Sequence, residues 1–157
     1  MRVDSITVHE DRVDVVVRVE GGEPLRTSAV GELPEKVLEL LPGLARHRCD
    51  NGACATFREE LEDTEIAHLF EHVVMEMMAL AGSPRSLKGE TEWDFERDGR
   101  GFFRVSLEYD DDLVCLGAVK AADRVMDHLL RGKAPFDVTA EAVRLRALRA
   151  APTAMPA

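Results

Sequence analysis

Two histidines and a glutamate carry the clearest chemical signal in this sequence, because all three lie within little more than one turn of a predicted helix. His68, Glu71 and His72 occupy positions i, i+3 and i+4 of residues 64–82, where apolar residues recur at helical spacing. Two imidazoles one turn apart can both coordinate a tetrahedral metal ion such as zinc. The carboxylate between them can then accept a proton from a water molecule at the open position. The spacing favours a metal site with Glu71 as general base.

The same spacing also has a simpler interpretation. The pattern His-x-x-Glu-His is that of the inverted zincin motif, but a charged, solvated helix face can carry two ordinary histidines in the same places. Glu76 lies one turn further along this polar strip. We expect Thr64 to cap the N-terminus of the helix and Gly82 to end it.

The two histidines need a third ligand, and residues 44–56 offer two candidates, His47 and Cys49. Each has an ordinary alternative role, since cysteine is commonly a small buried hydrophobe and a lone histidine is usually not a ligand. If Cys49 does not reach the histidines, Glu76 and Glu108 are the next candidates, as oxygen ligands.

The composition is that of one folded, acidic domain. The chain has 157 residues, is 45% hydrophobic and carries a formal net charge of -10. This charge argues against nucleic acid and anionic membranes as partners and permits a cationic substrate. The sequence has no apolar run of membrane-spanning length and no signal peptide at its start, so a cytoplasmic location is expected. Three cysteines do not make a disulfide framework, and we expect Cys54 and Cys115 to be packing residues.

The order of predicted elements indicates an α+β fold for a single domain over residues 1–150. We expect a small antiparallel sheet packed on two to three helices in two layers. The expected strands are residues 3–9, 12–19, 25–30 and 101–109, and the expected helical segments are residues 34–41, 57–62, 64–82, 113–131 and 139–150. Residues 151–157 are predicted to be a disordered tail.

Two polar segments leave more than one interpretation. Residues 83–100 are long enough for a flap or substrate loop, and they also suit a simple connection. Asp110-Asp111-Asp112 provides three consecutive carboxylates, which can bind a cation. We favour a solvated turn at the N-terminus of the next helix.

Several separate blocks of the sequence form a recognisable series. They are Leu41-Pro-Gly-Leu-Ala-Arg-His-Arg-Cys49, Gly52, Phe57-Arg-Glu-Glu-Leu61, His68-x-x-Glu71-His72-Val-Val-Met-Glu76, Leu80-Ala-Gly82 and Phe103-Arg-Val-Ser-Leu-Glu-Tyr109. In order and spacing, from about residue 33 to residue 149, this series resembles the N-terminal domain of cyanophycin synthetase. The resemblance is more specific than the short histidine motif alone, which pitrilysin-type peptidases share without the rest.

The resemblance implies a function as well as a fold. Cyanophycin synthetase joins aspartate and arginine with ATP, in two domains that follow the resembled one and have no counterpart here. In that family the N-terminal domain binds polymer, and in some members it resembles a metal-dependent hydrolase that cuts cyanophycin into primers. The resemblance implies a zinc site made by Cys49, His68 and His72, with Glu71 as base. This ligand set leaves a fourth position for water.

Two departures from the family pattern bear on the substrate. The family has a glycine-rich segment where this chain reads Ala53-Cys-Ala-Thr56. It also has Gly-Arg-Thr where this chain reads Gly89-Glu90-Thr91, in the expected substrate loop. An arginine that can hold a substrate carboxylate is thus replaced by a carboxylate, so the metal site can be retained while the substrate differs.

Two functions from different classes follow. The first is a zinc-dependent hydrolase of amide or isopeptide bonds, acting on cyanophycin-like or arginine-containing peptides. The second is a non-catalytic module that binds polymer or peptide, or serves assembly, with a structural metal or none. A fourth protein ligand would favour the second, and an open position beside Glu71 would favour the first. Either function is compatible with a homo-oligomer.

Overall fold

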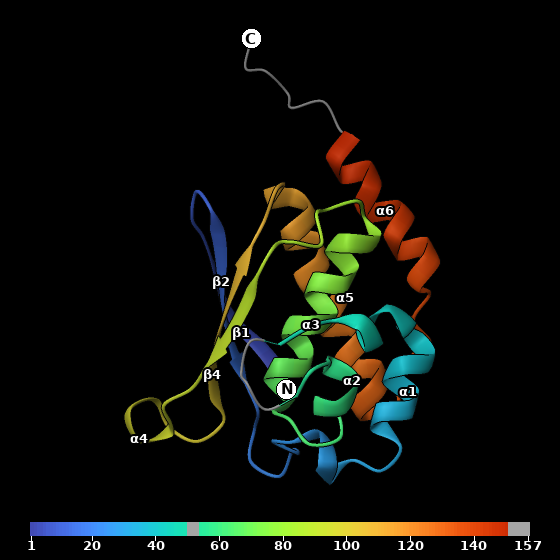
Figure 1. The fold of residues 1–157 in the computed structure, drawn as a ribbon. Coiled ribbons are helices and arrows are strands. Elements are labelled where there is room, and N and C mark those ends of the chain that lie inside the picture. The colour runs from blue at the N-terminus through green and yellow to red at the C-terminus, as the bar shows by residue number, and fades with distance from the viewer. Residues whose placement is uncertain (50–53, 151–157) are drawn as a thin grey trace.

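A four-stranded antiparallel sheet forms one side of the protein, and the helices cover one of its faces (Figure 1). The structure is a computed structural model that describes residues 1–49 and 54–150. The strands lie in the order β1-β2-β4-β3. Their bounds are β1 Arg2–Val8, β2 Arg12–Arg18, β3 Gly89–Glu92 and β4 Phe102–Glu108. The expected hairpin of β1 and β2 is confirmed, and β4 pairs with β2 along its whole length.

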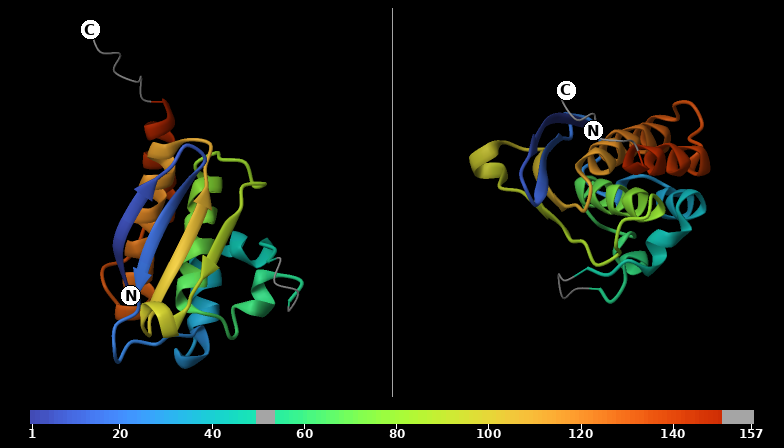
Figure 2. Two further views of the ribbon diagram at one scale, coloured as in Figure 1. Left: turned by 90° about the vertical axis from the view of Figure 1, so that its left-hand side faces the viewer. Right: turned by 90° about the horizontal axis from the view of Figure 1, so that it is seen from above.

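The helices α3 and α5 pack directly against the sheet, and α1 and α6 lie on the side away from it (Figure 2). The α-helices are α1 Leu33–Leu40, α2 Phe57–Glu60, α3 Ile66–Leu80, α4 Phe95–Asp98, α5 Asp112–Arg131 and α6 Val138–Ala150. Two 3₁₀ helices, η1 Thr27–Ala29 and η2 Pro42–Arg46, precede α2. The expected α+β class is therefore confirmed.

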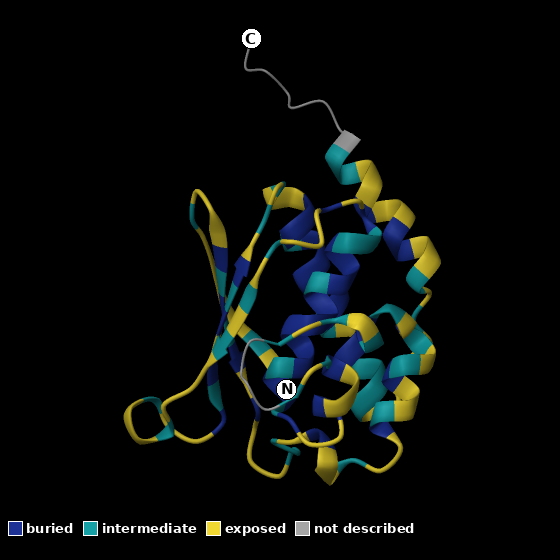
Figure 3. Cartoon of the chain, in the orientation of Figure 1, coloured by how far each residue is buried: buried dark blue, intermediate teal, exposed yellow. Residues whose placement is uncertain are grey.

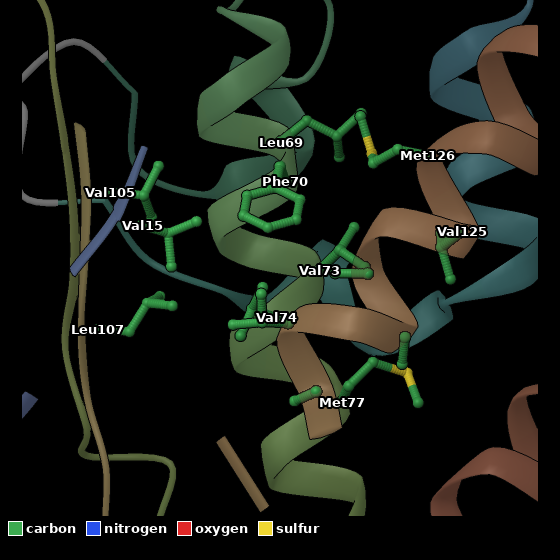
Figure 4. Close-up of a cluster of buried hydrophobic side chains, with 14 of the residues drawn as sticks. Val15, Leu69, Phe70, Val73, Val74, Met77, Val105, Leu107, Val125 and Met126 are labelled. Carbon is green, nitrogen blue, oxygen red and sulfur yellow. The ribbon is translucent and has the colours of Figure 1, made fainter. Parts of the chain in front are cut away.

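The core lies between the sheet and α3, and it continues on the other side of α3 toward α5. Val15, Val105 and Leu107 point from the sheet toward Phe70 and Val74 of α3 (Figure 4). The alternation that predicted the strands has this physical basis, because every second side chain of β2 and β4 is buried. Helix α3 is buried along most of its length (Figure 3), so polar side chains on it are enclosed by neighbouring elements.

The structure differs from the sequence-based expectation in two connections. Residues 25–30 do not form a strand of the sheet; Arg26 makes a single bridge to Glu65, and η1 follows it. This segment is held by backbone hydrogen bonds to the start of α3, from Thr27 N to Thr64 O and from Ile66 N to Leu25 O. A short segment with a β-like sequence thus stabilises the N-terminal end of α3 through backbone hydrogen bonds.

The second difference is that residues 83–100 contain β3 and α4, where the sequence suggested a loop or connection. The four residues of β3 lack the apolar alternation by which strands are predicted. Their pairing with β4 supplies the backbone hydrogen bonds that make them a strand. Helix α4 begins after Asp94, whose side chain accepts a hydrogen bond from Arg97 N.

The acidic turn before α5 agrees with the sequence-based expectation. Asp111 caps α5 by accepting a hydrogen bond from Val114 N, which confirms the expected turn and helix start. The predicted turn at residues 50–52 and the predicted tail at residues 151–157 lie outside the described residues. Within the described part of the chain, no helix is both long enough and apolar enough to traverse a lipid bilayer.

Candidate metal centre

One sulfur and two imidazole nitrogens meet at the N-terminal half of α3. Cys49 Sγ lies 3.2 Å from His72 Nε2 and 3.8 Å from His68 Nε2. The two Nε2 atoms are 3.1 Å apart. These residues form the only group of three potential metal ligands found among the described residues. The predicted convergence of Cys49 with both histidines, about twenty residues further along the chain, is thereby confirmed.

The spacing of the three ligand atoms fits a tetrahedral metal ion. Zinc binds nitrogen at about 2.0–2.1 Å and sulfur at about 2.3 Å, which places tetrahedral nitrogens about 3.3 Å apart and nitrogen about 3.6 Å from sulfur. The corresponding distances of 3.1, 3.2 and 3.8 Å scatter around these values. A single ion can therefore contact all three atoms with small side-chain adjustments.

Two short elements bring Cys49 to the helix. Leu44 of η2 is fully buried in the core, which ties the segment before Cys49 to the body of the protein. The start of α2 then bonds back to this segment, from Phe57 N to His47 O. The Phe57 ring is stacked on the His72 imidazole, with centroids 3.8 Å apart and an angle of 13° between the planes. The aromatic residue therefore helps to hold the imidazole plane.

The donor atoms are held in their uncharged forms. His72 is only 5% exposed, and burial, with His68 and His47 nearby, holds its pKa well below the ordinary value. Burial also lowers the pKa of His68, against the attraction of Glu60 and Glu65. Burial raises the pKa of the Cys49 thiol far above its usual range, and Glu60 adds to this effect. A cation bound between the three ligand atoms would lower the pKa of the Cys49 thiol again, because metal coordination deprotonates a thiol.

Burial of the motif contradicts the interpretation of a solvated helix face. Glu71 and Glu76 are 5% and 2% exposed, and both carboxylates have specific partners. Unpartnered carboxylates are rarely found so deep in a protein, because removing a charge from water is costly. The polar strip on α3 is therefore enclosed by α2, η2 and β3, and it does not face solvent.

Glu71 lies beside the three ligands without joining them. Thr91 Oγ1 donates a hydrogen bond of 2.6 Å to Glu71 Oε2. The carboxylate also lies against the backbone of Gly89, where a Cβ would be 2.6 Å from Glu71 Oε1. Burial raises the pKa of Glu71 to about 7, against the hydrogen bond from Thr91, and the nearby carboxylates Glu90 and Glu60 add to the rise. Such a group can both accept and return a proton near neutral pH.

The expected substrate segment, Gly89-Glu90-Thr91, is strand β3, and its residues alternate in role. Gly89 and Thr91 contact Glu71, whereas Glu90 is exposed. Glu90 thus lies between two residues that hold the Glu71 carboxylate in place. Its side chain contributes a negative charge to the groove and takes no part in the support of Glu71.

The remaining predicted residues have distinct places. His47 and Glu76 lie behind His72: His47 Nδ1 is 3.0 Å from His72 Nδ1, and His47 Nε2 is 2.7 Å from Glu76 Oε2. His47 contacts the ligand His72 and Glu76 contacts His47, and neither joins the ligand cluster. Glu108 is exposed, accepts a hydrogen bond from Lys88 N and is also outside the cluster.

Thr64 has a different role from the predicted helix cap, and Phe57 is a site residue that was not predicted. Thr64 was expected to cap α3, but Glu65 occupies the cap position without a side-chain cap bond. Thr64 Oγ1 instead lies 2.9 Å from His68 Nδ1. The signal for this contact was present in the sequence, because Thr64 precedes His68 by one helical turn. The stacking of Phe57 on His72 depends on tertiary structure and has no such local signal.

A groove of about 1020 Å³ opens onto the site. Cys49, His68, Glu71 and His72 all line it, and β3 forms part of its wall. Charged residues of both signs surround it: Asp11, Arg12, Arg46, Arg48, Glu60, Glu65, Arg85, Lys88, Glu90 and Glu108. The volume is sufficient for a ligand of several residues.

The fold and site together define an α+β domain with a candidate metal centre on its central helix. The chain belongs to the family described as the cyanophycin synthase-like N-terminal domain, whose model matches residues 14–131. Similar proteins include the cyanophycin synthetase of Crocosphaera subtropica, 32% identical over 107 residues, or 66% of this chain. Those of Trichormus variabilis and Nostoc sp. are each 31% identical over 118 residues, or 72% of this chain.

The chain corresponds to a small part of these relatives. The matched regions cover 12% of the Crocosphaera protein and 13% of each of the other two. The comparison therefore establishes the family of this domain, and the activity of the complete synthetases does not follow from it.

The structure predicts that Cys49 is a metal ligand and that the nearby Cys54 is not. We expect the protein to bind one equivalent of zinc or cobalt, and Cys49→Ser to weaken this binding strongly, because the sulfur ligand is lost. In the cobalt protein, Cys49→Ser should also remove the thiolate charge-transfer absorption. Cys54→Ser is the matched control, and it should retain both properties. Equal metal binding by wild type and Cys49→Ser would contradict the site.

Proposed function

We propose that this protein is a zinc-dependent hydrolase that cleaves amide or isopeptide bonds in arginine-containing, cyanophycin-like peptides. The observation that carries the proposal is the placement of Glu71, a buried carboxylate, beside three convergent metal ligands. Catalytic zinc sites characteristically have three protein ligands, whereas structural sites have four. Among the described residues, no fourth histidine, cysteine, aspartate or glutamate joins Cys49, His68 and His72.

Cys49, His68 and His72 would hold the zinc ion at the inner end of the groove. Bound zinc acts as a Lewis acid, which lowers the pKa of water and polarises a carbonyl group. The donor set suits this ion, since thiolate and imidazole are preferred zinc ligands. Phe57 limits reorientation of the His72 imidazole by stacking against it.

Glu71 would transfer the proton that amide hydrolysis requires. Its carboxylate accepts a proton from the attacking water as the new carbon–oxygen bond forms. The same carboxyl group then donates the proton to the nitrogen as the carbon–nitrogen bond breaks, so that a carboxylic acid and an amine leave. Thr91 fixes one carboxylate oxygen of Glu71 through its 2.6 Å hydrogen bond.

The charges along the groove support a substrate that carries positive charge. Glu90 and Glu108 are exposed at its wall, and the whole chain has a net charge of -10. Arg46 and Arg48 also line the groove, which suits a chain with carboxylates as well as guanidinium groups. The printed name of the relatives, cyanophycin synthetase, supports a polymer of this kind as the first substrate to test.

The test of this proposal is Glu71→Gln, assayed on a polymer of aspartate and arginine by the release of new amino groups. Glutamine keeps the size of the side chain and cannot act as a base, so turnover should fall at least about 10²-fold. Zinc content should remain at the wild-type level, because Glu71 is not a ligand. His68→Ala should lose zinc and turnover together.

A wild-type protein that binds the polymer and never releases amino groups would favour the alternative, a binding module. The relatives supply the reason to keep this alternative, since in them the domain is a small part of a synthetase. In that case Glu71→Gln and wild type should bind the polymer equally well. A Glu71→Gln variant with wild-type turnover would reject the catalytic role of Glu71.

A second prediction concerns the support of Glu71 by β3. In Gly89→Ala the new methyl group would lie 2.6 Å from Glu71 Oε1 and 2.8 Å from its Cγ, so the side chain must move. We expect turnover to fall while zinc affinity and fold are retained. Gly31→Ala is the matched control, because a Cβ there meets nothing within 4 Å. Unchanged turnover in Gly89→Ala would show that the position of Glu71 does not limit the reaction.

A further inference from the structure

We infer that two hydrogen-bond relays, each ending in an arginine–carboxylate pair, fix His68 and His72 in the tautomer that exposes Nε2 to a metal. The His72 relay consists of His47, Glu76 and Arg85. The His68 relay consists of Thr64, Glu65 and Arg26. The inference rests on the proposed metal site and is independent of whether the protein hydrolyses a substrate.

The direction of the His72 relay follows from the groups that can only accept or only donate. Arg85 Nη1 donates to Glu76 Oε2 at 2.9 Å. Burial opposes ionisation of Glu76, but the hydrogen bonds from His47 and Arg85 outweigh it and hold its pKa below the ordinary value. An ionised carboxylate only accepts, so His47 Nε2, at 2.7 Å, carries a proton and donates it.

The proton on His47 Nε2 determines the proton on His72. In the His47 tautomer that carries its proton on Nε2, Nδ1 acts as an acceptor. His72 Nδ1 lies 3.0 Å from this atom and therefore donates. An imidazole that carries its proton on Nδ1 presents the lone pair of Nε2, and His72 Nε2 lies 3.2 Å from Cys49 Sγ at the metal site. The relay thus links the exposed Arg85 to His72, whose Nε2 is the ligand atom.

The His68 relay has the same direction but a different intermediate. Arg26 Nη1 donates to Glu65 Oε1 at 2.6 Å, and the Thr64 hydroxyl donates to Glu65 Oε2 at 3.3 Å. The hydroxyl has one proton and has given it to Glu65, so it accepts from His68 Nδ1 at 2.9 Å. Glu60 Oε1, 3.7 Å from the same nitrogen, also favours a proton there. His68 Nε2 is left free to coordinate.

Close packing indicates that the His72 relay is a built feature. The Glu76 carboxylate lies against Gly43 in η2, where a Cβ would be 2.0 Å from Glu76 Oε1. Only glycine permits this approach. Buried ionic groups contribute little to stability compared with well-packed apolar groups, so their presence needs another reason. One such reason is that these groups orient a metal ligand by hydrogen bonding to its other nitrogen. Loss of this support commonly weakens metal binding about 10–100-fold.

The experiment measures zinc affinity by competition with a chelator and histidine tautomers by ¹⁵N NMR of the metal-free protein. We expect His72 and His68 of the wild type to show an unprotonated Nε2. Glu76→Leu should shift His72 toward the other tautomer and weaken zinc binding about 10–100-fold. Glu76→Gln should largely restore both, because its carbonyl oxygen can accept from His47. Glu108→Leu, a carboxylate on the same groove outside the relays, should change neither.

The His68 relay provides a second, independent test. Thr64→Val keeps the shape of the side chain and removes the hydroxyl, so it should weaken zinc binding and alter the His68 tautomer. Thr64→Ser should restore both. Thermal unfolding of each variant identifies any that fail to fold. If Glu76→Leu does not fold, the comparison of Thr64→Val with Thr64→Ser and the spectrum of the wild type still test the inference.

Three results would overturn the inference. One is a wild-type spectrum in which Nε2 of His68 or His72 carries the proton. Another is zinc affinity that is unchanged in folded Glu76→Leu and Thr64→Val. The third is equal loss in Glu76→Gln and Glu76→Leu with unchanged tautomers, which would indicate a packing role. Absence of hydrolytic activity would reject the proposed function without affecting these measurements.

Discussion

Burial of polar groups on α3 is the constraint on which the rest of the structure depends. Helix α3 lies between the sheet and α5 and carries four ionisable residues that are mostly shielded from water, His68, Glu71, His72 and Glu76. Each needs a partner, since an unpaired polar group in a protein interior is costly. The partners are His47 directly after η2, Thr64 before α3, Arg85 after α3, and Thr91 in β3. These short segments, which the sequence predicted only weakly, supply the hydrogen-bond partners of the buried polar residues on α3.

The two sides of α3 have different roles, since the apolar side packs in the core and the polar side carries the candidate metal site. Phe70, Val73, Val74 and Met77 pack into the core and fix the helix relative to the sheet and α5 (Figure 4). The polar side then has a rigid base, which metal and catalytic sites need because small displacements reduce their efficiency. Glu71 illustrates the result, because it is held between Thr91 and the backbone of Gly89.

The sequence predicted the parts of the site that follow from local periodicity. His68, Glu71 and His72 share one face because helical spacing requires it. The alternating valines predicted the strand β2, and the short connection before it predicted the hairpin with β1. Cys49 was assigned through family resemblance, since no local pattern relates it to α3. β3 has only four residues, without apolar alternation, and becomes a strand by pairing with β4. Thr64 satisfied the sequence rule for a cap, but its hydroxyl bonds to His68.

X-ray absorption spectroscopy of the zinc-loaded protein tests the central claim, an open metal site made by Cys49, His68 and His72, most directly. The structure predicts one sulfur at about 2.3 Å, two imidazole nitrogens at about 2.0–2.1 Å, and one further light atom that is exchangeable with solvent or an added anion. A shell with two sulfurs, or a fourth ligand contributed by the protein, would identify a closed structural site. A shell without sulfur would contradict the assignment of Cys49.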